Sequence, residues 1–325
     1  MSSLLSVKNM SINFDTPRGS LEAVRGVDIE IPAGTSVGVV GESGSGKTVM
    51  CRAAMGLLQG SNVKRSGTVV FDGHELTAMS KEEVRNLFGS GMAMIFQDPM
   101  TALNPVRRIG SQLSEGLRVR LGMSKADALV RSKELLELVR IPNAAAILKS
   151  FPYQLSGGMR QRVMIAIAIA CNPKLLFADE PTTALDVTVQ AQILQLLREL
   201  REDLKMSMVL VTHDLGVVAG NTDYVAVMYA GEVVEYAPTK KLFADMRMPY
   251  TEALLESIPK VDHKSGTRLA VIEGRLPNPT DRGAGCSFAP RCKYAQEKCH
   301  KEHPELKKDP DGHLYRCWFP IGEAK

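Results

Sequence analysis

The chain has 325 residues, of which 44% are hydrophobic and 23% charged, with a formal net charge of +4. This is the composition of a globular protein, so it excludes a largely disordered chain, and the small charge is no argument for a nucleic-acid partner. The apolar runs are shorter than the roughly 18–20 residues of a spanning helix, and the first residues lack the layout of a signal peptide. We therefore expect a soluble, cytoplasmic protein.

The N-terminal residues predict antiparallel strands. Leu5 to Ile31 consists of short alternating segments interrupted by Pro17-Arg18-Gly19, and Pro32-Ala33-Gly34 follows it as a turn. Phe14 lies near the end of the first segment. An aromatic ring there can stack on a purine, but a core phenylalanine in a strand would show the same spacing.

A strand, a glycine-rich loop and a helix then follow one another. Ser36 to Val40 is a short apolar run suited to a buried parallel strand. The next residues, Gly41-Glu42-Ser43-Gly44-Ser45-Gly46-Lys47-Thr48, fit the phosphate-binding pattern G-x-x-x-x-G-K-[ST]. In such a loop the backbone N–H groups and the helix N-terminus bind phosphate, while Lys47 reaches the β- and γ-phosphates and Thr48 holds Mg²⁺. Glycine-rich turns occur without this role, but the strand and helix around this one predict a nucleoside triphosphate site.

Three later apolar runs each end in polar residues. Gln97 follows the run Met92 to Phe96, Asp179 and Glu180 follow Lys174 to Ala178, and His213 follows Met208 to Thr212. Side chains at the carboxyl ends of buried strands point into the crevice where α/β folds bind ligands. Strands that alternate with helices predict a mainly parallel sheet with right-handed crossovers.

Each of these residues has a role beside a bound triphosphate. Asp179 can bind Mg²⁺, and Glu180 can polarise a water molecule for attack on the γ-phosphate. His213 can donate a hydrogen bond to the γ-phosphate or position that water, and Gln97 can join the Mg²⁺ shell. The plainer alternatives are an acidic pair that only ends a strand, a structural histidine and an unremarkable glutamine.

A helical segment interrupts the α/β pattern. Ile109 to Ile141 has a helical period with charged faces, which indicates an insertion between two halves of the core. It is followed by Tyr153 to Gln161, a polar turn with two glycines that opens a new apolar helix.

Together these motifs resemble those of the ATP-binding subunits of ABC transporters. They correspond, in order, to the phosphate loop, the Q-loop Gln97, the signature Leu155-Ser156-Gly157-Gly158-Met159-Arg160-Gln161, the pair Asp179-Glu180, the D-loop Ala184-Leu185-Asp186 and His213. Met159 departs from the family, in which many members have Gln. The resemblance implies that ATP and Mg²⁺ are the cofactors, with Thr48, Gln97 and Asp179 at the metal and Phe14 on the adenine.

The resemblance also implies partners. In this family two ATP-binding subunits pair head to tail, so that each nucleotide lies between one phosphate loop and the other subunit's signature. Nucleotide-binding roles are thereby implied for Ser156, Gly157, Gly158, Gln161 and Asp186. The second subunit is a sister or an identical copy. The resemblance further implies two transmembrane permease subunits and, indirectly, an extracytoplasmic substrate-binding protein. No nucleic acid is expected, and the ATP-binding subunit would lie at the cytoplasmic face of the membrane.

Within the family, the chain is similar to the dipeptide and oligopeptide importers. The likeness rests on Phe96 to Pro105, on Asp179 to Thr188 and on Met248-Pro249-Tyr250-Thr251, in which Met248 replaces the His of the branch. Importers of nickel and of antimicrobial peptides share the branch. A soluble ABC ATPase is disfavoured because the chain has one nucleotide domain and no basic stretch, and a P-loop kinase or GTPase has no use for the signature.

Six cysteines are present, and Cys286, Cys292, Cys299 and Cys317 gather near the C-terminal end. Disulfides are not expected in a cytoplasmic protein, and the spacings are wider than those of zinc hooks. A [4Fe–4S] cluster tolerates irregular spacing, and the resemblance to importer extensions favours it; zinc and unliganded thiols are the alternatives. Cys51 and Cys171 are expected to be buried packing residues.

The predicted fold is α/β: a P-loop, RecA-like ABC nucleotide-binding domain with an antiparallel β subdomain, a helical signature subdomain and a small cysteine-containing C-terminal extension. We assign the ATPase domain to residues 1–259, with the helical subdomain at about 99–158, and the extension to residues 260–325.

Overall fold

The structure is a computed structural model that describes residues 3–17, 19–183, 185–258, 272–280 and 282–322. The chain divides into two compact units. Unit 1 comprises residues 1–78 and 210–325, and unit 2 comprises residues 79–209. Strand β8 (Ser207–Thr212) crosses the division. Ala184, which belongs to the expected D-loop, lies outside the described residues.

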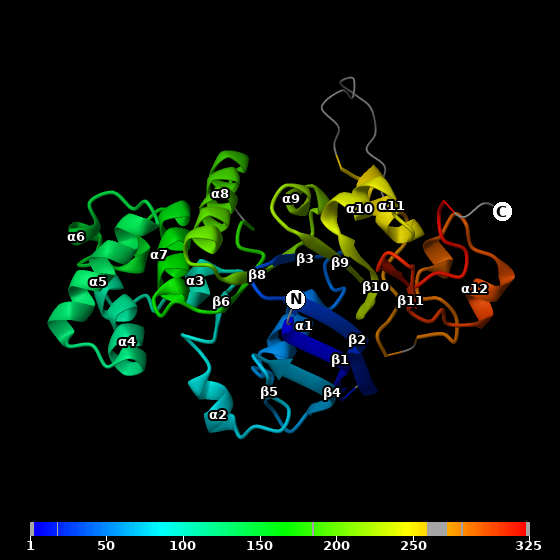
Figure 1. Cartoon of the computed structure of the whole chain (residues 1–325), viewed down its shortest axis with the longest axis horizontal. Coiled ribbons are helices and arrows are strands. Elements are labelled where there is room, and N and C mark those ends of the chain that lie inside the picture. Colours follow the sequence, from blue (N-terminus) through cyan, green and yellow to red (C-terminus); the bar gives the residue numbers. More distant parts are fainter. Residues whose placement is uncertain (1–2, 18, 184, 259–271, 281, 323–325) are drawn as a thin grey trace. The chain divides into compact units, whose positions relative to one another are not determined.

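The N-terminal part of unit 1 is an antiparallel sheet with the strand order β2-β1-β4-β5 (Figure 1). Its strands are β1 (Ser3–Thr16), β2 (Gly19–Pro32), β4 (Val63–Phe71) and β5 (His74–Glu75). Val7 stands opposite Ile29 on one side and Val69 on the other, and all three are buried. Alternating apolar residues therefore cover one face of this sheet, as the sequence predicts.

A second set of strands in unit 1 carries the glycine-rich loop. β3 (Ser36–Val40) pairs in parallel with β9 (Tyr224–Tyr229), which pairs antiparallel with β10 (Glu232–Pro238). Asp223 accepts hydrogen bonds from the backbone N–H and the hydroxyl of Ser36, at 2.8 and 2.7 Å, and so fixes the start of β3. The short strands β12 (Leu314–Tyr315) and β11 (Lys307–Lys308) add to the edge of β10. The C-terminal residues therefore continue the sheet that begins beside the loop.

Helices and an aromatic cluster complete unit 1. The helices are α1 (Lys47–Ala54), α9 (Leu215–Ala219), α10 (Thr239–Ala244), α11 (Pro249–Glu256) and α12 (Glu297–Lys301), and η2 (Ala289–Arg291) is a 3₁₀ turn. The rings of Tyr229, Tyr250 and Phe288 contact one another, with centroids 4.6–5.3 Å apart. Because all three are buried, β9, α11 and the cysteine-containing extension share one core.

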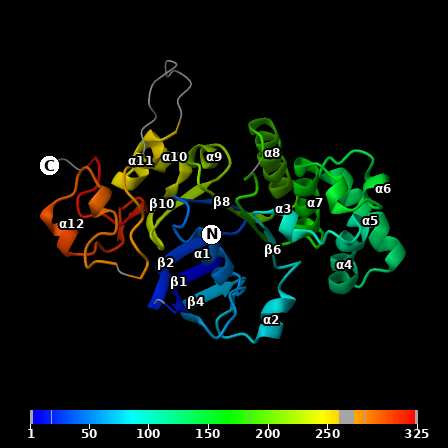
Figure 2. The same ribbon diagram turned by 180° about the vertical axis from the view of Figure 1, so that it is seen from behind.

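Unit 2 is mostly helical. It contains α2 (Lys81–Asn86), α3 (Pro99–Ala102), α4 (Ile109–Leu121), α5 (Lys125–Leu138), α6 (Ala144–Ile147), η1 (Pro152–Gln154), α7 (Gly157–Ile169) and α8 (Val187–Asp203), with the parallel strands β6 (Met92–Ile95) and β7 (Leu175–Asp179). Helices α4, α5 and α7 pack together, and the same grouping is seen from behind (Figure 2). The predicted helical period of residues 109–141 is confirmed, since α4 and α5 occupy most of it.

The mixed α/β fold predicted from the sequence is confirmed by the antiparallel and parallel sheets and their helices. In the part of the chain that the structure describes, no helix combines the length and apolar character that crossing a membrane requires. The domain boundary expected at residue 259 falls where the described residues are interrupted, so it stays a prediction.

Candidate nucleotide site

The glycine-rich loop connects the buried strand β3 to helix α1, as the sequence predicts. Gly41 has φ = 155°, and a Cβ there would lie 2.1 Å from the carbonyl oxygen of Met228. Gly46 has φ = 99°, and a Cβ there would lie 2.6 Å from the carbonyl oxygen of Ala23. Both positions require glycine because neighbouring backbone leaves no room for a side chain. The loop is therefore fixed in shape by the strands around it.

Lys47 is folded across this loop. Its buried ammonium group donates to the carbonyl oxygens of Gly41, at 2.7 Å, and Glu42, at 2.9 Å. The hydroxyl of Ser45 is also buried, and among the described residues it has no hydrogen-bond partner. A loop of backbone N–H groups, a helix N-terminus and a buried ammonium group can together bind a polyphosphate.

Two further residues of unit 1 were expected at the nucleotide. Phe14 is half-buried in β1, where it stands opposite Leu21 and Val63. His213 is exposed and directly follows β8, and the next residue, Asp214, caps helix α9. Neither side chain is fully buried, so both can contact a ligand.

The carboxylate of Glu180 is held in unit 2 by two side chains. Gln97 donates to its Oε2 at 3.0 Å, and the hydroxyl of Thr183 donates to the same oxygen at 2.9 Å. Glu180 has φ = 45°, a strained value for a residue with a side chain, and it follows the fully buried Asp179 at the end of β7. The structure thus brings together Gln97 and Glu180, as expected for strand ends. Thr183 was not singled out in the sequence, because a threonine in a turn carries no signal.

The signature residues form the start of helix α7. Ser156 is the N-cap, and its hydroxyl accepts a hydrogen bond from the N–H of Met159 at 3.3 Å. Ser156 and Gly157 are exposed, whereas Gln161 is buried. A Cβ on Gly158 would lie 3.0 Å from Val189, so the glycine lets α7 approach α8 closely. Asp186 caps α8 by accepting from the N–H of Val189 at 2.9 Å. The exposed N-terminus of α7 presents backbone donors suited to an anion.

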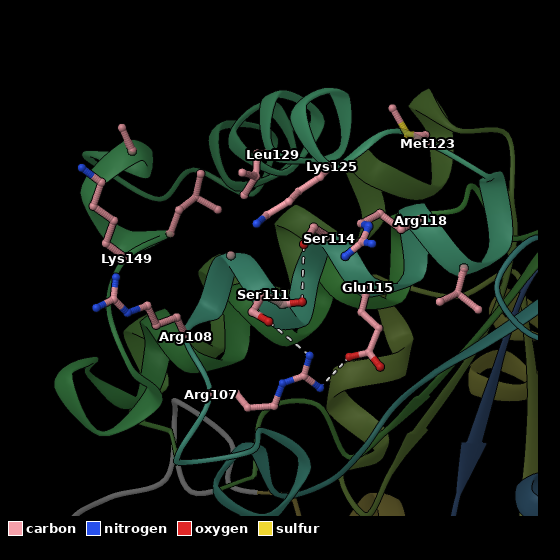
Figure 3. A pocket seen from close by; sticks show the side chains of 14 residues that line it. Arg107, Arg108, Ser111, Ser114, Glu115, Arg118, Met123, Lys125, Leu129 and Lys149 are labelled. Atoms are coloured by element: carbon pink, nitrogen blue, oxygen red, sulfur yellow. Dashed lines mark hydrogen bonds and ion pairs between the residues drawn. The ribbon is translucent and has the colours of Figure 1, made fainter.

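Unit 2 also has a basic groove beside α4 and α5, with a volume of about 980 Å³ (Figure 3). Its charged lining residues are Arg107, Arg108, Glu115, Arg118, Lys125 and Lys149. Arg107 is paired with Glu115 at 2.6 Å, which leaves a surplus of positive charge along the groove. None of the residues predicted to bind nucleotide lines it. The groove therefore suits a second, acidic ligand or partner.

The four C-terminal cysteines line one small cavity in unit 1. Burial raises the pKa of Cys286 and of Cys292, and that of Cys317 to about 12. The thiols of Cys286, Cys292 and Cys317 are therefore neutral at pH 7 unless a cation binds them.

The six cysteines are free thiols. Cys51 and Cys171 are buried, which confirms that they are packing residues. Over the described ranges, no group of three or more His, Cys, Asp or Glu side chains is arranged to hold a metal ion. The expected metal of the extension therefore stays a prediction.

Two family models match the chain. The one described as ABC transporter matches residues 24–183, and the one described as Oligopeptide/dipeptide transporter, C-terminal region, matches residues 234–299. The chain therefore belongs to the family of ABC transporter ATP-binding subunits, in the branch of the oligopeptide and dipeptide transporters. This confirms the resemblance found in the sequence.

Similar proteins of known name span nearly the whole chain. The oligopeptide transport ATP-binding protein AppD of Bacillus subtilis is 47% identical, over 98% of this chain and 97% of that protein. The dipeptide transport ATP-binding protein DppD of Escherichia coli is 46% identical, over 99% and 98%. Among solved structures, the dimeric ATP-binding cassette MJ0796 bound to ADP and Pi has a TM-score of 0.65 and 28% identity, covering 72% of this chain and 98% of its own.

Proposed function

We propose that this protein hydrolyses ATP to drive the import of short peptides through a membrane permease. The observation that carries the proposal is the phosphate loop. This loop places the buried Lys47 at the start of α1. The branch of the family supports the choice of cargo. Nickel and antimicrobial peptides are the alternative cargoes, and a soluble ABC ATPase is the alternative machine.

Each side chain has a role in this reaction. Lys47 neutralises the β- and γ-phosphates, Phe14 stacks on adenine, and His213 orients the γ-phosphate or the attacking water. Thr48, Gln97 and Asp179 would hold Mg²⁺, which offsets the negative charge of the phosphate oxygens when bound. Glu180 accepts the proton of the attacking water, and Gln97 and Thr183 keep its carboxylate in place.

We retain the ATPase domain at residues 1–259, with its helical subdomain at about 99–158, and the extension at 260–325.

The exposed signature supports pairing between two ATP-binding subunits. The N-terminus of α7 exposes Ser156 and Gly157, and we assign them, with Gly158, Gln161 and Asp186, to the nucleotide of the partner subunit. ATP then closes the pair because donors from both subunits bind it, and hydrolysis releases the pair. The dimeric state of the similar cassette agrees with this proposal.

The basic groove beside α4 and α5 is the surface that we assign to the permease. Arg118, Lys125 and Lys149 give it a surplus of positive charge, and the apolar Val119 and Leu129 among its lining residues are exposed. An acidic, amphipathic segment of a permease subunit matches both features. Such docking would hold the protein at the cytoplasmic face of the membrane.

The extension is proposed to hold a [4Fe–4S] cluster. The four cysteines line one cavity, which brings four possible thiolate ligands of such a cluster together. A cluster is larger than a single ion, so its ligands stand farther apart than those of zinc. In number and in their shared cavity these residues would suit the cluster, which would bind the thiolates and stabilise the extension.

Replacing Glu180 by Gln tests the catalytic assignment. The amide keeps an oxygen that accepts from Gln97 and Thr183 but cannot take a proton, so we expect turnover to fall by about 10²-fold or more. ATP binding should persist, and nucleotide-loaded pairs should accumulate in size-exclusion chromatography. The matched control is Glu137→Gln on the surface of α5, which should hydrolyse ATP normally. Equal turnover of the Glu180 variant and the parent would rule out the assignment.

Charge reversal tests the permease groove. The variant Arg118→Glu/Lys125→Glu should lose co-purification with the permease subunits, because its groove then repels an acidic segment. ATP hydrolysis by the isolated subunit should be unchanged. Reversal of the exposed Lys205 at the end of α8 is the control. Normal assembly of the double variant would show that the permease docks elsewhere, and a parent that never co-purifies with membrane subunits would favour the soluble alternative.

Anaerobic purification tests the cluster. The protein should be brown and contain iron and sulfide in equal amounts. Changing any one of the four cavity cysteines to Ser should lower the iron content, whereas Cys51→Ser and Cys171→Ser should not. Protein that carries one zinc ion and no iron would contradict the cluster while leaving the extension a metal-stabilised element.

A further inference from the structure

The extension contacts the phosphate loop through a partly buried ion pair. The guanidinium group of Arg291 donates to both carboxylate oxygens of Glu42, at 2.6 and 2.9 Å, across a separation of 249 residues. Glu42 is the second residue of the loop, and Arg291 ends η2 immediately before Cys292. The Arg291 side chain is only 5% exposed. A bidentate pair of this geometry fixes direction as well as distance.

Arg291 is itself held on several sides. Its remaining donors reach the carbonyl oxygens of Glu273, at 2.8 Å, and Ile272, at 3.0 Å, and the hydroxyl of Tyr229, at 3.3 Å. The guanidinium also lies 5.8 Å from the centre of the Tyr229 ring. Lysine has neither the fork of donors nor the planar group that these contacts use. Arg291 is thus a fixed point on which the loop can be positioned.

Glu42 is bound through its backbone as well. Its N–H donates to the hydroxyl of Tyr250 at 3.0 Å, and its carbonyl oxygen accepts from the ammonium group of Lys47 at 2.9 Å. The ring of Tyr250 packs against those of Tyr229 and Phe288 in the core of unit 1. The position of Glu42, together with Gly41, therefore helps to set where the Lys47 ammonium group lies.

Charge gives the pair a second consequence. A loop that binds a triphosphate gains nothing from a carboxylate, since like charges repel. Arg291 neutralises that carboxylate by pairing with both of its oxygens. With Arg291 gone, Glu42 would be an uncompensated, partly buried charge close to the phosphates.

We propose that Arg291 is a positioning residue for the ATP site, which fixes Glu42 and, through it, Lys47, so that ATP affinity depends on the docked extension. The inference deepens the proposed ATPase function and rests on ATP binding at this loop. It does not require a cluster at the cysteines, because the contacts of Arg291 are made by protein groups alone.

The test uses the full-length protein and a fluorescent ATP analogue with Mg²⁺. Arg291→Met should weaken binding about tenfold or more and raise KM for ATP, with a smaller change in kcat at saturation. Arg291→Lys should fall between Met and the parent, because it keeps the charge but loses the bidentate contact. The double variant Glu42→Gln/Arg291→Met should bind ATP better than Arg291→Met alone, since the second change removes the uncompensated charge.

Arg247→Met is the matched control. Arg247 is also a part-buried arginine of unit 1, paired with Asp309 and Asp245, and it has no contact with the loop in the described structure. Its loss should lower the melting temperature without changing ATP affinity. If Arg291→Met fails to fold, the double variant Glu42→Gln/Arg291→Lys is compared with Arg291→Lys alone in the same way.

Two results would overturn the proposal. One is unchanged ATP affinity in folded Arg291→Met, and the other is affinity loss that follows melting temperature equally in Arg247→Met and Arg291→Met, without rescue by Glu42→Gln. If the parent itself binds no ATP, the proposed ATPase function fails instead, so the two failures can be told apart.

Discussion

The ammonium group of Lys47 is buried between two carbonyl oxygens of its own loop, and the surrounding structure serves to keep it there. A buried cation is costly unless polar groups surround it, and its charge is available to an incoming phosphate. The close approach of the Ala23 and Met228 backbones to Gly46 and Gly41 prevents the loop from relaxing. The anion site is therefore shaped before any nucleotide arrives.

The C-terminal extension belongs physically to this loop's surroundings. Strand β12 pairs with β10, and the rings of Tyr250 and Phe288 pack against Tyr229 on β9. Tyr250 stands in the segment that resembles the His-Pro-Tyr-Thr motif of the branch, and its hydroxyl accepts from the loop. A motif that distinguishes peptide importers thus contacts the same loop that marks the protein as an ATPase.

Local sequence patterns predicted much of the fold and of the nucleotide site. Three features were predicted because a period or spacing coincides with a residue type that only one conformation satisfies. They are the phosphate loop, the strand ends before Gln97 and Glu180, and the helix cap at Ser156. The grouping of the four cysteines was also visible in the sequence, and the structure places all four around one cavity. The Arg291–Glu42 pair could not be predicted, because an arginine and a glutamate 249 residues apart carry no local signal. The hydroxyl of Thr183 on Glu180 was missed for a different reason: the two residues are close in sequence, but a threonine in a turn carries no signal, and its contact is set by the bend at Glu180.

The central claim is that ATP hydrolysis at this loop powers peptide uptake. The most direct measurement reconstitutes the protein with its permease subunits in vesicles, with ATP on the side of this protein and a labelled short peptide on its binding protein outside. We expect the peptide to accumulate inside in the presence of ATP, and hydrolysis to rise when the loaded binding protein is added. Hydrolysis that ignores the loaded binding protein, with no accumulation of peptide in fully assembled vesicles, would contradict the account.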